Sequence, residues 1–197
     1  MPKLSEEDMQ SRRRDIIDAA GRCFARKGIQ ATTMREIFAE VGMSAGAVYN
    51  YFRTKDDLIA SGIVSSTEET ADLIKAVAIS EDGPRAFRDV IGFFLADLEQ
   101  ARADGRAKAT PMVHAEVSVK PALLQKFKEG RSKIREALTE QVGVMRPELG
   151  PEQCARLASF VYTLYEGMVA SAALEEDLDV EAMAGIIDLV LTQYSAR

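Results

Sequence analysis

The chain has 197 residues, of which 47% are hydrophobic, and its formal net charge is −6. It holds two cysteines, far apart and not in a CxxC pair, and one histidine, so we expect neither a zinc site nor a cofactor. No apolar run approaches the roughly 18 residues of a membrane-spanning helix. The first 30 residues lack an apolar secretory segment, so we expect a soluble, cytoplasmic protein with no membrane partner.

The charge is unevenly distributed along the chain. Residues 1–55 carry ten Lys or Arg and seven Asp or Glu, a balance of +3, whereas the remainder carries fifteen and twenty-four, a balance of −9. A basic N-terminal part on an acidic body is typical of a protein whose first segment meets an anionic partner, although +3 also fits an ordinary solvated surface. The two cysteines, Cys23 and Cys154, are expected to be small buried apolar residues.

Apolar residues recur at helical spacing throughout the chain, and alternation of β-branched residues is scarce. The pattern predicts an all-α protein with nine helices, over about 6–27, 34–41, 45–52, 55–79, 84–103, 111–119, 121–144, 152–176 and 180–194. Ser5 with Asp8 forms a capping-box pattern before the first helix, and Thr33 and Ser44 are N-caps of the second and third. Gly28 and Gly42 end the first two helices.

Residues 32–58 carry the most informative motif and read TTMREIFAEVGMSAGAVYNYFRTKDDL. Two short helices joined by a three- to four-residue turn that contains Gly42 are the pattern of a helix-turn-helix. The residues expected to face inward are Ile37, Phe38, Val41, Val48 and Phe52. The second helix begins with Ala45, Gly46 and Ala47, whose small side chains allow its N-terminus to enter a major groove, and it then presents Tyr49, Asn50 and Tyr51.

This segment resembles the DNA-binding region of TetR-type (tetracycline-repressor family) transcriptional regulators. In that family a helix-turn-helix is followed by a Y-x-[HY]-F element and a lysine at the start of the next helix, and here Tyr49–Phe52 and Lys55 match. The resemblance is specific over roughly residues 10–60 and is architectural beyond them. It implies a helix-turn-helix DNA-binding domain over 1–54 and a helical ligand-binding and dimerisation domain over 55–197.

The resemblance assigns DNA contacts residue by residue. Thr33 and Ser44 cap helices that point at phosphates, and Tyr49 and Lys55 contact phosphates. Arg35 reaches a guanine or a phosphate, Asn50 reads an adenine edge or binds a phosphate, and Ala47 packs on a thymine methyl. The arginines at 12–14 approach the DNA or form a solvated face.

The resemblance also implies a homodimer built from the last two helices. The apolar stripe expected to face the partner is Phe160, Leu164, Gly167, Ser171 and Leu174, continued by Ile187, Val190 and Tyr194. The opposite side of the penultimate helix carries Leu157, Val161, Tyr165, Met168 and Ala172. Gly167 either permits close approach of the partner backbone or is a tolerated mid-helix glycine.

The implied ligand pocket lies within the central helices. Its candidate walls are aromatic or otherwise apolar, with one histidine: Phe93, Phe94, Leu98, Met112, His114, Phe127, Tyr162, Tyr165 and Met168. Each of them is equally compatible with ordinary core packing. Glu116 and Glu166 would suit a cationic ligand if buried, and are otherwise surface residues.

Together these features predict a ligand-responsive regulator, most simply a repressor that a small apolar or amphipathic molecule releases from palindromic operator DNA. An activator would share the same fold. An enzyme is disfavoured because the chain has no nucleophile elbow or phosphate-binding glycine loop, and its lone histidine allows few acid–base designs. A protein-interaction module is the other alternative, and DNA binding would distinguish it. The effector, the operator sequence and the regulated genes are not encoded in any motif.

Overall fold

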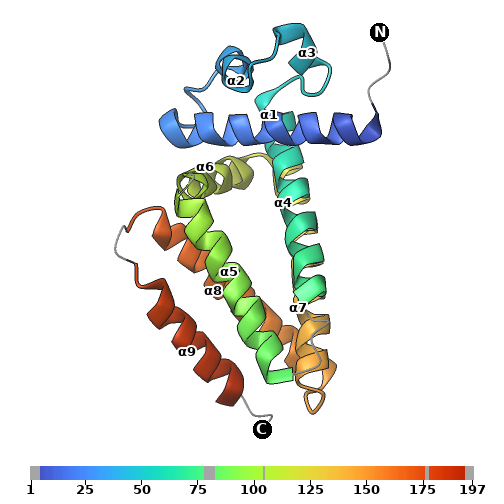
Figure 1. The fold of residues 1–197 in the computed structure, drawn as a ribbon, viewed down its shortest axis with the longest axis vertical. Coiled ribbons are helices and arrows are strands. Elements are labelled where there is room, and N and C mark those ends of the chain that lie inside the picture. The colour runs from blue at the N-terminus through green and yellow to red at the C-terminus, as the bar shows by residue number, and fades with distance from the viewer. Residues whose placement is uncertain (1–4, 78–82, 104, 176–177, 194–197) are drawn as a thin grey trace.

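The protein is described here by a computed structural model that covers residues 5–77, 83–103, 105–175 and 178–193. All regular structure in these ranges is helical, which confirms the all-α prediction. The helices are α1 (Glu6–Lys27), α2 (Met34–Val41), α3 (Ala45–Tyr49), α4 (Lys55–Val77), α5 (Gly83–Ala103), α6 (Arg106–Val119), α7 (Pro121–Met145), α8 (Pro151–Ala172) and α9 (Val180–Gln193). Figure 1 shows α1–α3 as a head at one end of the molecule, with α4 running from the head into a body formed by the later helices.

The predicted caps define the helices of the head. Ser5 with Asp8, and Thr33 with Glu36, each form a complete capping box, and the Ser44 side chain accepts from the Ala47 backbone N–H. Gly28 and Gly42 follow α1 and α2 with φ of 83° and 70°, a region that favours glycine. Local sequence alone therefore fixes where these helices begin and where the first two end.

Three helix boundaries differ from the prediction. The sixth helix begins at Arg106, not near 111, so Pro111 lies inside it. As the sixth residue of this helix, Pro111 lacks the N–H that would donate to the Ala107 carbonyl, and the helix continues past it. The third helix ends at Tyr49 and not near 52, and α8 ends at Ala172 and not at 176, a position outside the described residues.

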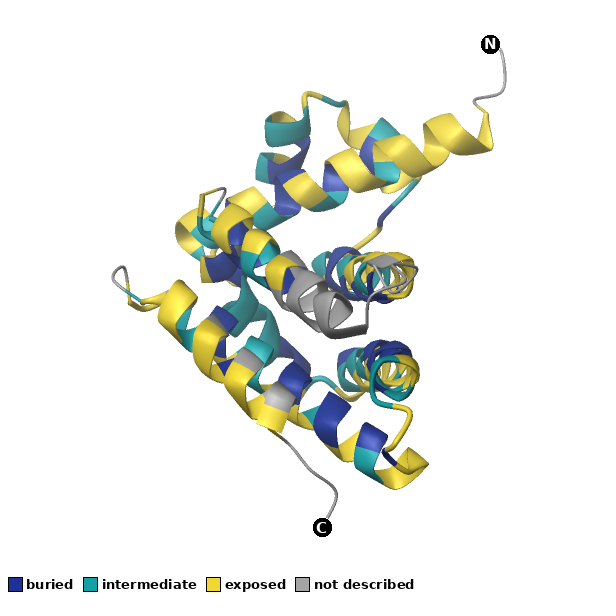
Figure 2. Cartoon of the chain, turned by 60° about the horizontal axis from the view of Figure 1, so that its bottom comes forward, coloured by how far each residue is buried: buried dark blue, intermediate teal, exposed yellow. Residues whose placement is uncertain are grey.

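Buried apolar side chains gather in two clusters, which follow the head and the body. Figure 2 marks the buried positions along the helices of both parts. The head cluster is built around Ile16, Ile37 and Phe52, and it also takes in Ile63 of α4 and Val117 of α6. The core of the head therefore continues past residue 54, and the predicted domain boundary stays a prediction.

The body is held together mainly by α7, which packs against α4 and α8. At the α4–α7 crossing a Cβ added to Gly130 would lie 2.7 Å from both Oγ1 and Cγ2 of Thr67, so only glycine fits there without movement. The buried Thr67 hydroxyl donates to the Ile63 carbonyl at 2.7 Å.

Cys23 and Cys154 are free thiols, 2% and 4% exposed, and they lie in different clusters, as predicted for small buried apolar residues. Among the described residues, no helix combines the length and apolar character needed to cross a membrane.

Candidate DNA-binding head and effector cavity

The helix-turn-helix is built as the sequence predicts. Ile37, Phe38, Val48 and Phe52 are buried in the head cluster, and Val41 packs against it partly buried. Gly42 in the left-handed conformation turns the chain between α2 and α3, because its N–H can return to the Phe38 and Ala39 carbonyls. The inward residues thereby fix which side chains of α2 and α3 face outward.

The outward face carries the predicted DNA contacts. Thr33, Arg35, Ser44, Ala45, Gly46 and Asn50 are exposed, whereas Ala47 and Tyr51 are half-buried. Tyr49 is 48% exposed, and its ring meets the Phe38 ring edge-on with centroids 5.0 Å apart. One side of this aromatic ring is thus anchored, and the other is available to a partner. The individual DNA contacts stay predictions.

Lys55 has a role that the sequence did not indicate. Its Nζ donates to the carbonyls of Ile29 at 2.6 Å, Gln30 at 3.2 Å and Thr32 at 2.9 Å. An ammonium group has three donors, so in this structure the loop between α1 and α2 takes all of them. The phosphate contact of Lys55 stays a prediction, whereas the geometry shows a side chain that positions the loop before α2.

The arginines at 12–14 divide into two kinds. Arg13 lies over the Phe52 ring, 4.5 Å from its centroid, and donates to the Tyr51 carbonyl at 3.5 Å and the Ser61 hydroxyl at 3.3 Å. It therefore links α1 to the segment that joins α3 and α4. Arg12 and Arg14 are exposed, and either reading of them stays open.

A polar cluster joins the head to α6. Lys120 Nζ lies 2.7 Å from Asp56 Oδ1 at the start of α4 and 2.7 Å from Glu116 Oε2 on α6. The Gln30 side chain donates to the buried Glu116 carboxylate from the α1–α2 loop. Lys120 and Gln30 together hold the pKa of Glu116 below its usual value, so this carboxylate stays charged. Glu116 is thus buried, but its carboxylate binds Lys120 and Gln30 of the protein itself. It is therefore not available to the cationic ligand that the sequence analysis considered for it.

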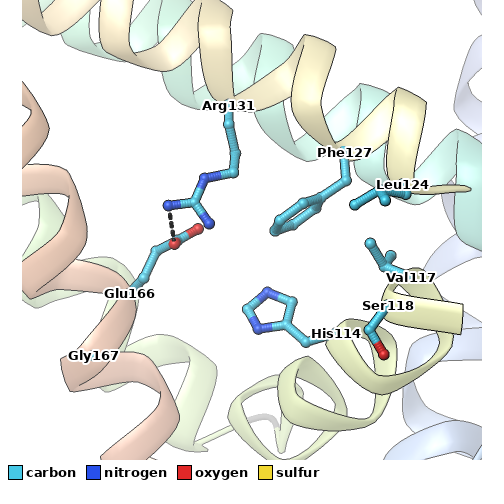
Figure 3. Close-up of a pocket in the computed structure, with 8 residues that line it drawn as sticks. All are labelled: His114, Val117, Ser118, Leu124, Phe127, Arg131, Glu166 and Gly167. Atoms are coloured by element: carbon cyan, nitrogen blue, oxygen red, sulfur yellow. Dashed lines mark ion pairs between the residues drawn. The ribbon is translucent and has the colours of Figure 1, made fainter.

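An open cavity of about 390 Å³ lies between α6, α7 and α8 (Figure 3). Its lining residues are His114, Val117, Ser118, Leu124, Phe127, Arg131, Glu166 and Gly167. A second hollow, of about 530 Å³, lies between α7 and α8 and is lined mainly by charged and hydroxyl side chains. The first is the candidate effector site, because apolar walls with a few convergent polar groups are typical of small-molecule sites.

Charge and aromatic contacts converge in this cavity. Arg131 Nη2 lies 2.6 Å from Glu166 Oε2, and the Arg131 guanidinium lies over the rings of Phe127 and Tyr162 at 5.4 and 5.1 Å. The His114 ring meets the Phe127 ring edge-on at 5.1 Å. Burial lowers the pKa of His114 below 6.5, so its imidazole is mainly neutral at pH 7.

The predicted pocket residues fall in several places. His114 and Phe127 line the cavity, whereas Phe94, Leu98, Tyr162 and Met168 belong to the body core, and Met112 packs on the head cluster. Tyr165 also packs on the body core, where its hydroxyl donates to Asp97 Oδ2 at 2.5 Å. The Phe93 side chain lies outside the described residues. Core packing thus accounts for six of the nine, because aromatic and methionine side chains fill a core as readily as they line a cavity. The sequence analysis did not predict Arg131 as a lining residue, because a charged side chain on a helix is expected to face solvent.

The predicted partner-facing residues lie mostly at the surface of the protomer. Phe160 is 43% and Leu174 83% exposed, Gly167 is exposed, and Leu164 and Ser171 are half-buried. On α9, Val190 is 37% exposed, but Ile187 is 8% exposed and packs into its own body core, which corrects its assignment to the partner face. Ile186 and Leu189 on the same helix are 62% and 54% exposed, and the sequence missed them because α9 is apolar on several sides. Tyr194 lies outside the described residues.

The head and its sequence match known proteins. The sequence model of the family described as "Bacterial regulatory proteins, tetR family" matches residues 16–61, which run from the middle of α1 through α2 and α3 into the first turns of α4. The chain is 41% identical over 91 residues to the HTH-type transcriptional repressor Rv1474c of Mycobacterium tuberculosis, a match that covers 46% of each chain. It is 27% identical over 200 residues to the HTH-type transcriptional repressor AcnR of Corynebacterium diphtheriae, over 96% of this chain and 95% of AcnR.

The helix-turn-helix segment over residues 16–61 is thus that of the tetR family of bacterial regulatory proteins, and the similarity to HTH-type transcriptional repressors continues at lower identity through the rest of the chain. The likeness extends through the whole fold: the transcriptional regulator FadR of Bacillus subtilis, solved with stearoyl-CoA, superposes with a TM-score of 0.72 over 93% of this chain and 99% of FadR, at 16% identity. The family consists of transcriptional regulators, which are not enzymes. The TetR head thus lies on a body that has the same fold as a ligand-bound relative.

Proposed function

We propose that this TetR-family regulator is a homodimeric repressor, and that a small apolar or amphipathic molecule releases it from two-fold operator DNA. The observation that carries the proposal is the head itself: a helix-turn-helix whose outward face presents Arg35, Tyr49 and Asn50 within the segment that matches the family. Such a regulator meets the chromosome, which in bacteria places it in the cytoplasm.

The dimer is supported by exposed apolar side chains on the last two helices and directly after α8. Phe160, Leu174, Ile186 and Leu189 are each more than 40% exposed, and a helix surface of this kind is stabilised by a partner. Two-fold operators need two heads about 34–36 Å apart, one per major groove, which a dimer supplies. A second copy of the chain is therefore the expected partner of this surface.

Helix α6 offers a route from the cavity to the head. His114, Val117 and Ser118 line the cavity. Glu116 of the same helix and Lys120, the residue directly after it, hold the α1–α2 loop and the start of α4. A molecule that binds between α6 and α7 and displaces α6 must therefore move the contacts that orient the head. It releases DNA only to the extent that it binds the displaced state more tightly.

The proposal is tested with a DNA duplex selected in vitro by the protein itself. We expect the selected site to be two-fold, and we expect loss of one half-site to weaken binding strongly in fluorescence anisotropy. Tyr49→Ala should nearly abolish binding while the dimer stays folded, because the ring is anchored to one neighbour and half exposed. The control is Val144→Ala, a 64% exposed residue at the far end of α7, which should change nothing. A folded protein that selects no duplex would refute the proposed function.

A further inference from the structure

We propose that the effector of the cavity is an uncharged, compact molecule, with an apolar body and one head group that both donates and accepts hydrogen bonds. This inference rests on the proposed function, because it takes the cavity between α6, α7 and α8 as the effector site. It goes further by naming the charge of the ligand and the residues that select it.

The first step is the charge balance of the lining. Arg131 and Glu166 are the charged residues among the lining side chains, and they already form an ion pair with 2.6 Å between Nη2 and Oε2. Their side chains are only 28% and 19% exposed, so both charges are partly shielded from water. Because His114 is neutral, the lining has no net charge. Neither an anionic nor a cationic ligand therefore finds an unpaired opposite charge there.

The second step is the cost of breaking that pair. An anionic ligand must draw Arg131 away and leave the Glu166 carboxylate, while a cationic ligand must draw Glu166 away and leave Arg131. Each stranded charge is partly buried, and separating a buried pair is far more costly than leaving it intact. An uncharged ligand avoids this penalty, so the ion pair acts against charged ligands of either sign.

The third step is the shape and polarity of the remaining walls. Val117, Leu124 and Phe127 form an apolar side, and the volume of about 390 Å³ is near the lower end of the ~300–1,000 Å³ typical of small-molecule sites. Figure 3 shows the His114 ring facing the Arg131–Glu166 pair across the cavity. A neutral imidazole has one donor and one acceptor, and a guanidinium has more donors than one ion pair uses, so a hydroxyl group between them is matched on both sides. A polyanion such as the stearoyl-CoA bound by the Bacillus subtilis FadR finds no unmatched positive charge in this lining.

The test uses three probes of similar shape that differ in charge: 4-propylphenol, 4-propylbenzoate and 4-propylbenzylammonium. Their binding to the full-length dimer is measured by isothermal titration calorimetry at pH 7.5. We expect the phenol to bind about tenfold or more tightly than either ion, because each ion must strand a partly buried charge. Wild-type protein that prefers an ion, or that binds none of the three probes, would overturn the inference.

Two charge-removing substitutions make the test specific. Glu166→Gln leaves Arg131 without its partner and should move the preference to the benzoate, whereas Arg131→Gln should move it to the ammonium. The matched control is Glu136→Gln, on an exposed side chain of α7 outside this cavity, which should leave the order unchanged. An unchanged order in both folded variants also overturns the inference. Binding of the selected DNA duplex is measured separately, so a protein that binds DNA but prefers a charged probe refutes only the ligand class, and one that binds no DNA refutes the proposed function.

Discussion

Replacing Lys55 by methionine separates two roles that this side chain can have in the head. The substitution keeps most of the apolar stem and removes the ammonium that donates to three carbonyls of the α1–α2 loop. That loop ends at Thr33, the N-cap of α2, so it sets the position of the helix-turn-helix. We expect Lys55→Met to destabilise the protein and to weaken DNA binding indirectly, through a misplaced α2.

The magnitude follows from the three hydrogen bonds. Those to Ile29 and Thr32 are partly buried, at 2.6 and 2.9 Å, whereas the one to Gln30 is exposed, at 3.2 Å. A hydrogen bond from a charged donor contributes about 1.5–3 kcal/mol net, and an exposed one is largely replaced by water. Two bonds at the low end of that range, less some rehydration of the freed carbonyls, predict a loss of about 2–3 kcal/mol.

Urea denaturation at one fixed protomer concentration measures this loss, because the apparent stability of a dimer depends on concentration. A salt titration of operator binding measures the other role: a lost phosphate contact lowers the slope of log affinity against log salt by about 0.9. We expect reduced stability with an unchanged slope. The control is Lys126→Met, whose side chain is 51% exposed and pairs with Glu129 on the surface of α7. A lower slope with unchanged stability would refute the positioning role and support the phosphate contact.

Four other substitutions test separate parts of the structure. Gly130→Ala would place a Cβ 2.7 Å from the Thr67 side chain of α4, which should lower the free energy of unfolding by about 1–3 kcal/mol in urea denaturation. Gly143→Ala on the same helix has room for the added Cβ and should be neutral or stabilising. Equal effects of the two substitutions would contradict the tight crossing. Tyr49→Phe keeps the anchored ring and removes the hydroxyl, so anisotropy should show operator binding about tenfold weaker at unchanged stability, as for one lost bond to a charged phosphate; unchanged affinity would show that the hydroxyl contacts no DNA. A Cβ added at Gly167 meets no atom within 4 Å in the protomer, so Gly167→Glu should leave the protomer folded. Sedimentation should then show a monomer, and a stable dimer would move the interface elsewhere. The pKa of His114 is lowered in the folded protein, so as the pH falls through 6.5 the unfolded chain takes up a proton first and stability is lost. His114→Gln should reduce this loss in thermal melts between pH 7 and pH 5.5. Parallel curves of melting temperature against pH for the two proteins would contradict this expectation.

The parts of the fold that could be predicted from the sequence are those set by local chemistry. A hydroxyl N-cap with an acidic residue three positions later marks a helix start wherever it occurs, and Thr33 with Glu36 forms that capping box here. Gly42 marks the turn between two short helices because a left-handed residue is needed there. These local rules placed the helix-turn-helix, and with it the family.

The rest depends on contacts between distant segments, which no local pattern encodes. A lysine at a helix start looks the same whether it meets a phosphate or the loop carbonyls that Lys55 contacts from 23 to 26 positions away. Ile186 and Ile187 are adjacent on an apolar helix, and only packing decides that the second is buried and the first is 62% exposed. From the sequence Arg131 is expected to be a surface residue, and only the structure shows that its guanidinium lies 2.6 Å from Glu166 of the next helix.

Helix α8 connects the two events that a repressor must couple. Glu166 and Gly167 line the cavity, and Gly167 also lies on the stripe expected to face the partner, between the half-buried Leu164 and Ser171. A ligand that binds beside the Arg131–Glu166 pair therefore contacts the helix that we propose to face the partner. The same ligand touches α6, which holds the head through Glu116 and through Lys120 directly after its last residue. The distance between the two heads depends on the angle between the protomers and on the orientation of each head. A small displacement at one cavity would change both of these. A shift of only a few ångströms away from successive major grooves is enough to lose the operator.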